Sequence, residues 1–346
     1  MKKLSILLII VMLSLVSVLS GCSQAEEVEP VEEVEEVEEV EEVVEEVVEP
    51  LRIVGLLPGR IDDMSFNQQL YEGLMIIKDT LGEQVDVTYV EGLYEVVDIE
   101  PALRDYAEQG YDLIIGHGFQ FQDPIMAVAE LYPDVNFAIG PGAYMTAENV
   151  STYDAFNPEV GYVLGTVAGY VTEAKIIGTI GGVQLPNINA VHESFRMGSQ
   201  SVDPDIQVIN IYTGDFSDAE AAREAGLSMV EQGADLVFAS GNGMVVGALG
   251  AARDMDTLFI TTSNMSASAP EIFLASLNYN YHVALQQIVN DVIAGTFGNS
   301  SYALTLANEG LGLVIHLPEV VADSQAEIDS VIAGLIDGTI VIPEIE

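Results

Sequence analysis

Short β-rich runs alternate with longer amphipathic segments along almost the whole chain from Leu51 onward. This alternation is typical of right-handed βαβ units, in which parallel strands form a sheet and helices cover its faces. We therefore expect an α/β fold with parallel sheets. The expected strands are 52–57, 85–90, 112–115, 136–139, 150–153, 175–180, 206–212, 235–239 and 257–261. The expected helices are 66–80, 100–109, 123–131, 158–172, 189–199, 218–232, 243–254 and 281–294.

One local pattern occurs twice. Residues 106–116 read YAEQGYDLIIG and residues 229–240 read MVEQGADLVFAS. Gly110 and Gly233 stand where a helix commonly ends on a left-handed cap residue, and each is followed by a buried strand. The repetition predicts two similar lobes, with a ligand cleft at the carboxyl ends of their strands.

The first residues have the pattern of a secretory signal peptide. Lys2 and Lys3 precede an apolar stretch that is too short for a typical membrane-spanning helix, which needs about 20 residues. Leu19-Ser20-Gly21 then leads into Cys22, which is the only cysteine. We predict a lipoprotein signal peptide at 1–21 and lipidation of Cys22, with a free thiol or an intermolecular disulfide as the alternative.

Residues 22–50 contain Cys22 and an acidic Glu/Val tether with fourteen glutamates and no basic residue. Like charges at this density repel and extend a chain, so we expect a solvated tether. A helix is the rival interpretation. It is disfavoured because valines spaced by three drift around a helix and glutamates four apart repel each other.

Composition narrows the classes of partner. The chain has 10 Lys and Arg against 55 Asp and Glu, a formal net charge of −45. Nucleic acids and anionic lipid surfaces both require basic patches, so no nucleic-acid partner is expected. A phosphorylated ligand is also disfavoured, although a local site can override the overall field.

Eight stretches that cover most of the body, in order, resemble the basic membrane protein (BMP) family of nucleoside-binding lipoproteins. Two further stretches, 149–153 and 266–281, resemble a purine-base-binding branch of the same family. The eight are 62–67, 118–123, 132–139, 161–168, 175–178, 203–208, 212–218 and 232–235.

The resemblance implies a type I periplasmic-binding-protein fold: two Rossmann-like lobes with parallel sheets, joined by a three-stranded hinge. Lobe 1 would comprise 51–154 plus 279–302, and lobe 2 would comprise 155–277 plus 303–346. The implied function is that of a monomeric solute-binding lipoprotein of an ABC importer. Such a protein is anchored on the extracytoplasmic face of the cell membrane, partners a permease and binds a purine nucleoside or base without a cofactor or metal.

The resemblance also places stacking residues. Phe66 and Phe216 would hold a planar ligand between the two lobes, because aromatic faces stack on any ring with a π face. The remaining candidates follow the same strand ends. Ser65 is expected to cap a helix, Asn67 to bond a base edge or help cap, Gly118 to let a ligand approach the backbone, Phe119 to form a cleft wall, and His117 to face the ligand or act as a satisfied polar residue.

This chain departs from the family pattern at the positions expected to bind base and sugar hydroxyls. Nucleoside-binding relatives have aspartate at Leu57, paired aspartates at Thr262 and Asn264 (or Ser263 if the register slips by one), and lysine at Tyr279. All are uncharged here. Neutral hydrogen bonds are weaker than charge-assisted ones, so a base, a modified nucleoside or another small polar compound fits this set.

Two other classes stay open. An enzyme is disfavoured because the four histidines, His117, His192, His282 and His316, are isolated, and neither an HExxH pair nor a GxSxG elbow occurs. The third class is a ligand-sensing or interaction lipoprotein without a transport role.

Overall fold

The computed structural model describes residues 49–241 and 243–345, which belong to one compact unit. The predicted signal peptide, Cys22 and all but the last two residues of the tether lie outside the described residues.

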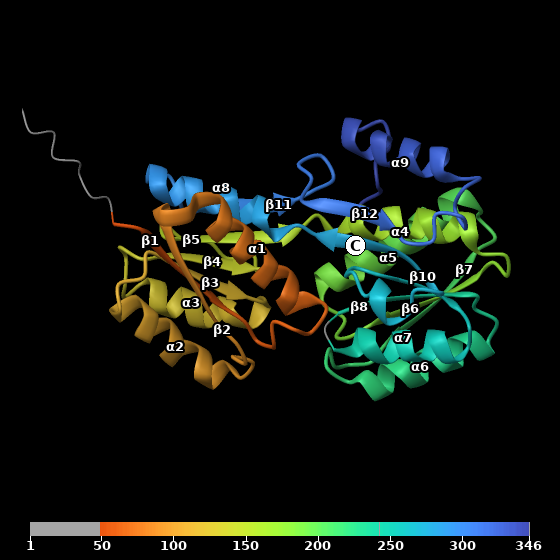
Figure 1. Ribbon diagram of the computed structural model, residues 1–346, viewed down its shortest axis with the longest axis horizontal. Coiled ribbons are helices and arrows are strands. Elements are labelled where there is room, and N and C mark those ends of the chain that lie inside the picture. Colours follow the sequence, from red (N-terminus) through yellow and green to blue (C-terminus); the bar gives the residue numbers. More distant parts are fainter. Residues whose placement is uncertain (1–48, 242, 346) are drawn as a thin grey trace, which may run out of the picture. The chain divides into compact units, whose positions relative to one another are not determined.

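The first lobe is built on a six-stranded sheet with the order β11-β5-β4-β3-β1-β2, and every pairing in it is parallel. Helices α1 and α8 pack together on one face, and α2 and α3 cover the other (Figure 1). The strands are β1 (Leu51–Leu56), β2 (Val85–Val90), β3 (Leu113–His117), β4 (Asn136–Gly140), β5 (Val150–Ala155) and β11 (Ser301–Leu304). The helices are α1 (Phe66–Leu81), α2 (Val96–Glu108), α3 (Gln122–Ala129) and α8 (Tyr281–Ala294).

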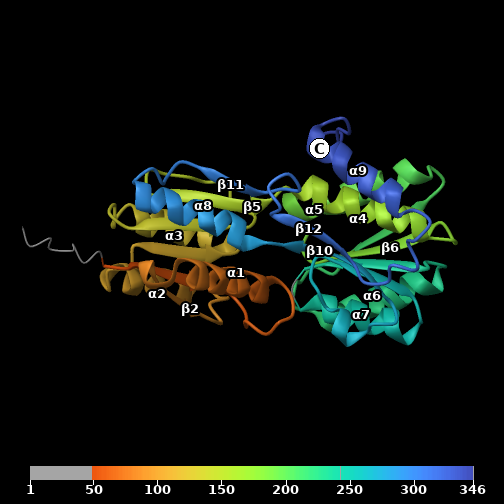
Figure 2. The same ribbon diagram turned by 45° about the horizontal axis from the view of Figure 1, so that its top comes forward.

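The second lobe repeats this plan with the order β12-β10-β9-β8-β6-β7. Helices α4 and α5 lie on one face, α6 and α7 on the other, and α9 packs on α4 (Figure 2). The strands are β6 (Ile176–Gly181), β7 (Gln207–Tyr212), β8 (Leu236–Ser240), β9 (Leu258–Thr261), β10 (Phe273–Tyr279) and β12 (Leu311–Ile315). The helices are α4 (Asn157–Val171), α5 (Pro186–Val202), α6 (Ala219–Glu231), α7 (Met244–Asp254) and α9 (Gln325–Asp337).

The chain passes between the two sheets three times, at 155–157, 279–281 and 304–311. The α/β class with two Rossmann-like lobes is thus confirmed. One edge differs from the expectation of parallel sheets, because β12 pairs antiparallel with β10. The reason is topological: β10 leaves the second lobe, while β12 re-enters it after β11, so neighbouring strands run in opposite directions.

The central strands β3 and β8 are buried along all five of their residues. Such continuous burial is expected for parallel strands covered on both faces. On the second lobe, Gly161 and Gly165 of α4 and Gly198 of α5 allow the two helices to touch backbone to backbone, since a Cβ at any of them would overlap a carbonyl group of the other helix. The tight core fixes the strand ends from which the site is made.

Candidate ligand-binding site

A cavity of about 490 Å³ lies between the two lobes. This volume is within the range of small-molecule sites, which is about 300–1,000 Å³. Most of its lining follows the carboxyl ends of strands from both sheets, as the repeated sequence pattern predicts. These residues include Pro58 after β1, Gly118, Phe119 and Gln120 after β3, Pro141 after β4, Asp154 at the end of β5, Val183 after β6, Gly214, Asp215 and Phe216 after β7, Ser240 ending β8 and Thr262 after β9.

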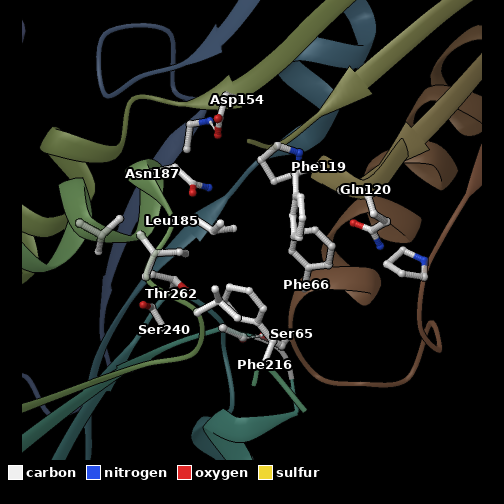
Figure 3. Close-up of a pocket in the computed structure, with 18 of the residues that line it drawn as sticks. Ser65, Phe66, Phe119, Gln120, Asp154, Leu185, Asn187, Phe216, Ser240 and Thr262 are labelled. Atoms are coloured by element: carbon white, nitrogen blue, oxygen red, sulfur yellow. Dashed lines mark hydrogen bonds between the residues drawn. The ribbon is translucent and has the colours of Figure 1, made fainter. Parts of the chain in front are cut away.

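Three phenylalanine rings line this cavity (Figure 3). Phe66 is the first residue of α1, and Phe119 follows β3, so both come from the first lobe. Phe216 comes from the loop between β7 and α6 in the second lobe, and its ring lies over Gly182, where any Cβ would overlap it. Aromatic surfaces from both lobes therefore meet in one space.

His117 supports Phe66 from behind. The two rings stack with centroids 3.9 Å apart, and His117 itself is fully buried and does not line the cavity. Its Nε2 lies 3.1 Å from the Phe66 carbonyl oxygen and its Nδ1 lies 2.8 Å from the Tyr153 hydroxyl. Burial lowers the pKa of His117 to about 3, so the ring is neutral. A ligand-facing His117 is thus wrong, and the alternative of a satisfied polar residue is correct.

The start of α1 is capped by Asp63 and not by the Ser65 side chain. The Asp63 carboxylate accepts hydrogen bonds from the backbone N–H groups of Ser65, Asn67 and Gln68. Ser65 instead lines the cavity and donates its Oγ proton to the Gly241 carbonyl oxygen in the second lobe, at 2.9 Å. The expected capping role of Ser65 is therefore wrong, because the carboxylate two residues earlier already satisfies these donors.

Asn67 is also placed differently from the expectation of a ligand contact. Its side chain is fully buried, donates to the Asp63 carboxylate at 2.7 Å and accepts from the Gly59 N–H at 3.0 Å. It does not line the cavity. Asn67 holds the loop after β1 to the helix start, which is the second of the two roles predicted for it.

Of the four positions that depart from the family pattern, Thr262 and Tyr279 line the cavity, whereas Asn264 and Leu57 do not. Asn264 accepts hydrogen bonds from Ser266 and lies in a smaller polar pocket of about 300 Å³ next to the cavity. The reason is direction: the chain turns after Thr262, and the Asn264 side chain closes that turn.

Several polar lining residues were not among the predicted site residues, and one of them is Asp154. Its Oδ2 accepts from the Gly142 N–H at 2.9 Å and its Oδ1 from the Ala155 N–H at 2.7 Å. Burial raises the pKa of this carboxyl to about 6 against the lowering effect of these donors. An acidic residue beside the carboxyl end of a buried strand was the available signal. The other polar residues are Gln69, Glu95, Gln120, Asn157, Asn187, Asp215 and Ser240.

A family model described as "ABC transporter substrate-binding protein PnrA-like" matches residues 51–346. The chain belongs to this Bmp family. Two relatives are a purine-binding protein of Brucella abortus, 32% identical over 55% of this chain and 54% of that protein, and the ABC transporter nucleoside-binding protein BmpA of Lactococcus lactis, 30% identical over 57% of this chain and 56% of that protein. The chain thus spans about half the length of these two curated relatives.

A solved ABC transporter solute-binding protein from Conexibacter woesei has the same fold, with a TM-score of 0.71 and 27% identity over 85% of this chain and 98% of that one. The description of the matching family is that of ABC transporter substrate-binding proteins, a class of protein that binds a small ligand.

The ionisable side chains that line the cavity of this Bmp-family protein are acidic. Glu95, Asp154 and Asp215 line it, and none of its described lining residues is Lys, Arg or His. Such a lining suits a neutral or cationic ligand.

Between residues 49 and 345, leaving aside 242, no group of three or more His, Cys, Asp or Glu is arranged to hold a metal ion. In the same part of the chain no helix combines the length and apolarity needed to cross a bilayer.

Proposed function

We propose that this Bmp-family protein captures a purine nucleoside or purine base for an ABC importer. The observation that carries the proposal is that Phe66 and Phe119 from one lobe and Phe216 from the other line the same cavity (Figure 3). A flat heterocycle presents a π face to each ring, and base–aromatic stacking is worth about 1–3 kcal/mol per base.

Capture depends on both lobes. Phe66 is held in place by His117 behind it, while Phe216 is carried by a loop of the second lobe. A ligand that contacts rings on both sides stabilises the arrangement in which the lobes are closed, which is the hinge mechanism of two-lobed receptors. The names of the two relatives, one purine-binding and one nucleoside-binding, support this ligand class.

The choice between a base and a nucleoside depends on the residues that replace the family's charged groups. Thr262 and Tyr279 both reach the cavity and offer neutral hydroxyls. Such groups bond sugar hydroxyls more weakly than carboxylates do. We therefore propose that the base supplies most of the affinity.

The protein acts as a receptor and not as a catalyst in this proposal. The described lining of the cavity contains no Cys, His or Lys, the side chains most used as activated nucleophiles or bases. We further propose that Cys22 carries the lipid and that the acidic tether separates the lobes from the membrane surface.

Isothermal titration calorimetry of the residue 49–346 body with purine bases, nucleosides and sugars tests the proposal. We expect one or more purines to bind. At a purine concentration of 100 times Kd, the free energy of unfolding of the protein should rise by about 2.7 kcal/mol, which thermal unfolding measures. Phe66→Ala and Phe216→Ala should each weaken binding by about 5- to 150-fold. Phe156→Ala is the matched control, because Phe156 is 47% exposed and lies outside the cavity.

Three outcomes would contradict the proposal. Turnover of a bound purine would favour an enzyme, and the absence of any heat with every compound would favour an interaction lipoprotein. Equal losses in Phe66→Ala and Phe156→Ala would show that the rings of the cavity do not hold the ligand.

A further inference from the structure

Asp154 is an acidic side chain in a cavity that contains no basic one. It is the penultimate residue of β5, just before the chain first crosses to the second lobe, and it lines the cavity. Figure 3 shows Asp154 and Asn187 at one end of the cavity and Phe216 at the other. Asp154 therefore lies at the opposite end of the cavity from Phe216.

The carboxylate retains capacity to accept hydrogen bonds. An ionised carboxylate has about four acceptor positions. The N–H groups of Gly142 and Ala155 use two of them, and the Asn157 side chain lies close enough to lower the pKa of Asp154 further. At least one acceptor position is left without a described protein donor.

The charge of Asp154 is not balanced by a neighbour. Its described partners are two backbone N–H groups and an amide, and no ion pair among the described residues includes it. With a pKa of about 6, the group is mostly ionised at neutral pH. Burying an ionised carboxylate costs free energy that additional hydrogen-bond donors offset.

We infer that Asp154 is the specificity-determining residue of the cavity, where its carboxylate accepts hydrogen bonds from N–H groups on the edge of the stacked ligand. This inference deepens the proposed function and rests on it. It assigns the ligand to neutral heterocycles with ring or exocyclic N–H groups. Phosphorylated compounds are rejected, because Asp154, Asp215 and Glu95 all repel an anion.

Calorimetry with two variants tests the role of Asp154. Asp154→Asn keeps the shape of the side chain and removes its charge, and Asp329→Asn makes the same change at an exposed residue of α9 outside the cavity, whose carboxylate accepts a hydrogen bond from Gln325. The probes are adenine, guanine and hypoxanthine, their nucleosides, their N-methylated derivatives and the nucleoside 5′-monophosphates. We expect Asp154→Asn to weaken binding of the best unmethylated probe by about tenfold or more, and Asp329→Asn to change it by less than about threefold.

The methylated probes locate the hydrogen bond independently. Methylation of the N–H that meets Asp154 should weaken binding to the wild-type protein by about tenfold, and the same methyl should cost much less in Asp154→Asn, because the two changes remove one interaction. Monophosphates should bind the wild-type protein at least about tenfold more weakly than their nucleosides.

The outcomes separate the two proposals. If the wild-type protein binds a purine but Asp154→Asn binds it equally well, the role of Asp154 is overturned and the proposed function stands. If the wild-type protein binds no purine, the proposed function is overturned and the role of Asp154 with it. If Asp154→Asn does not fold, the wild-type series decides: equal affinity for every methylated derivative overturns the inference.

Discussion

Phe66 and His117 illustrate how a single residue can be made rigid by its neighbours. His117 stacks on Phe66, bonds its carbonyl oxygen and the Tyr153 hydroxyl, and meets the Tyr281 ring edge-on with centroids 5.1 Å apart. Both ring nitrogens are therefore occupied in the neutral form. A ring held on one face by such packing presents its other face to a ligand without losing further conformational freedom.

The neutral state of His117 predicts a pH dependence of stability. Its pKa is about 3 in the folded protein against an ordinary value of 6.5, so below pH 6.5 the unfolded chain binds the extra proton and the folded protein loses stability as the pH falls. At 1.36 kcal/mol per pH unit, His117 costs about 2 kcal/mol between pH 6.5 and pH 5. The free energy of unfolding of His117→Gln, from urea titrations, should therefore fall less over this interval than that of the wild-type protein.

The comparison with His117→Gln isolates one group among several that titrate in this interval. His192, with a pKa lowered to about 4, acts in the same direction as His117. Asp154, with a pKa raised to about 6, acts in the opposite direction because its folded form takes up the proton first. His192 and Asp154 are present in the wild-type protein and in His117→Gln, so their contributions cancel in the comparison. If the free energy of unfolding changed equally with pH in the two proteins, His117 would not be buried in its neutral form.

At the scale of elements, α1 joins the two lobes. Besides Phe66 and Ser65, it carries Gln69, whose Nε2 donates to the Thr262 carbonyl oxygen at 3.2 Å and whose Oε1 accepts from the Tyr279 N–H at 3.0 Å. These partners lie at the ends of β9 and β10. The helix that presents one aromatic plate is thus bonded to the strands next to the hinge.

Gln69→Ala should weaken the attachment of α1 to the ends of β9 and β10, and with it ligand binding. The change removes two hydrogen bonds and leaves the Tyr279 N–H without its partner, which we expect to cost about 1–3 kcal/mol of stability. Thermal unfolding and calorimetric Kd values measure the two effects. Gln68→Ala is the control, because the described hydrogen bonds of the Gln68 side chain go to the Met64 N–H and the Glu72 carboxylate within the same segment. If the two variants are equally stable and bind equally well, α1 does not join the lobes in solution.

The contact between α4 and α5 predicts a strong effect of a single methyl group. Gly165→Ala would drive its Cβ into the Phe195 carbonyl group, and backbone cannot move aside as a flexible side chain can. We expect a loss of about 3 kcal/mol or more in the free energy of unfolding from urea titrations. Gly250→Ala, in a helix with nothing within 4 Å of the new Cβ, should be neutral or stabilising by up to about 1 kcal/mol. Similar losses at both sites would mean that the two helices are less closely packed than described.

For the whole molecule, charge repulsion is the dominant long-range interaction. The chain carries a formal net charge of −45, and its described ion pairs all lie at partly exposed positions, where such pairs contribute little. Salt screens repulsion between exposed charges, and the screening length falls from about 30 Å at 0.01 M to about 3 Å at 1 M.

Raising sodium chloride from about 10 mM to about 0.5 M should therefore raise the Tm at pH 7. Differential scanning calorimetry measures the change. The same series near pH 4.5, close to the sequence pI of about 4.1, should show a much smaller effect because the net charge is nearly neutralised. A Tm that falls with salt at pH 7 would instead mean that surface ion pairs outweigh the repulsion.

Most elements are recognisable from local sequence because hydrophobic periodicity and glycine caps are local signals. Strand β2 and helix α8 have the predicted bounds, and the other seven predicted strands from β1 to β8 end within two residues of theirs. Strands β10, β11 and β12 and helix α9 escaped prediction. The three strands owe their pairing to distant partners on each side of the hinge, which no short window of sequence contains.

The residues of the site, like the elements, were predicted only in part. Sequence resemblance indicated Phe66, Gly118, Phe119, Phe216, Thr262 and Tyr279, all of which line the cavity, since the ends of parallel strands meet at one edge of a sheet. Tertiary packing decided the rest: it turned Asn67 and His117 into buried supports and brought Asp154 to the cavity. The sequence determines which residue stands at each position. The direction of its side chain depends on which neighbours can satisfy its hydrogen bonds once the two sheets have packed.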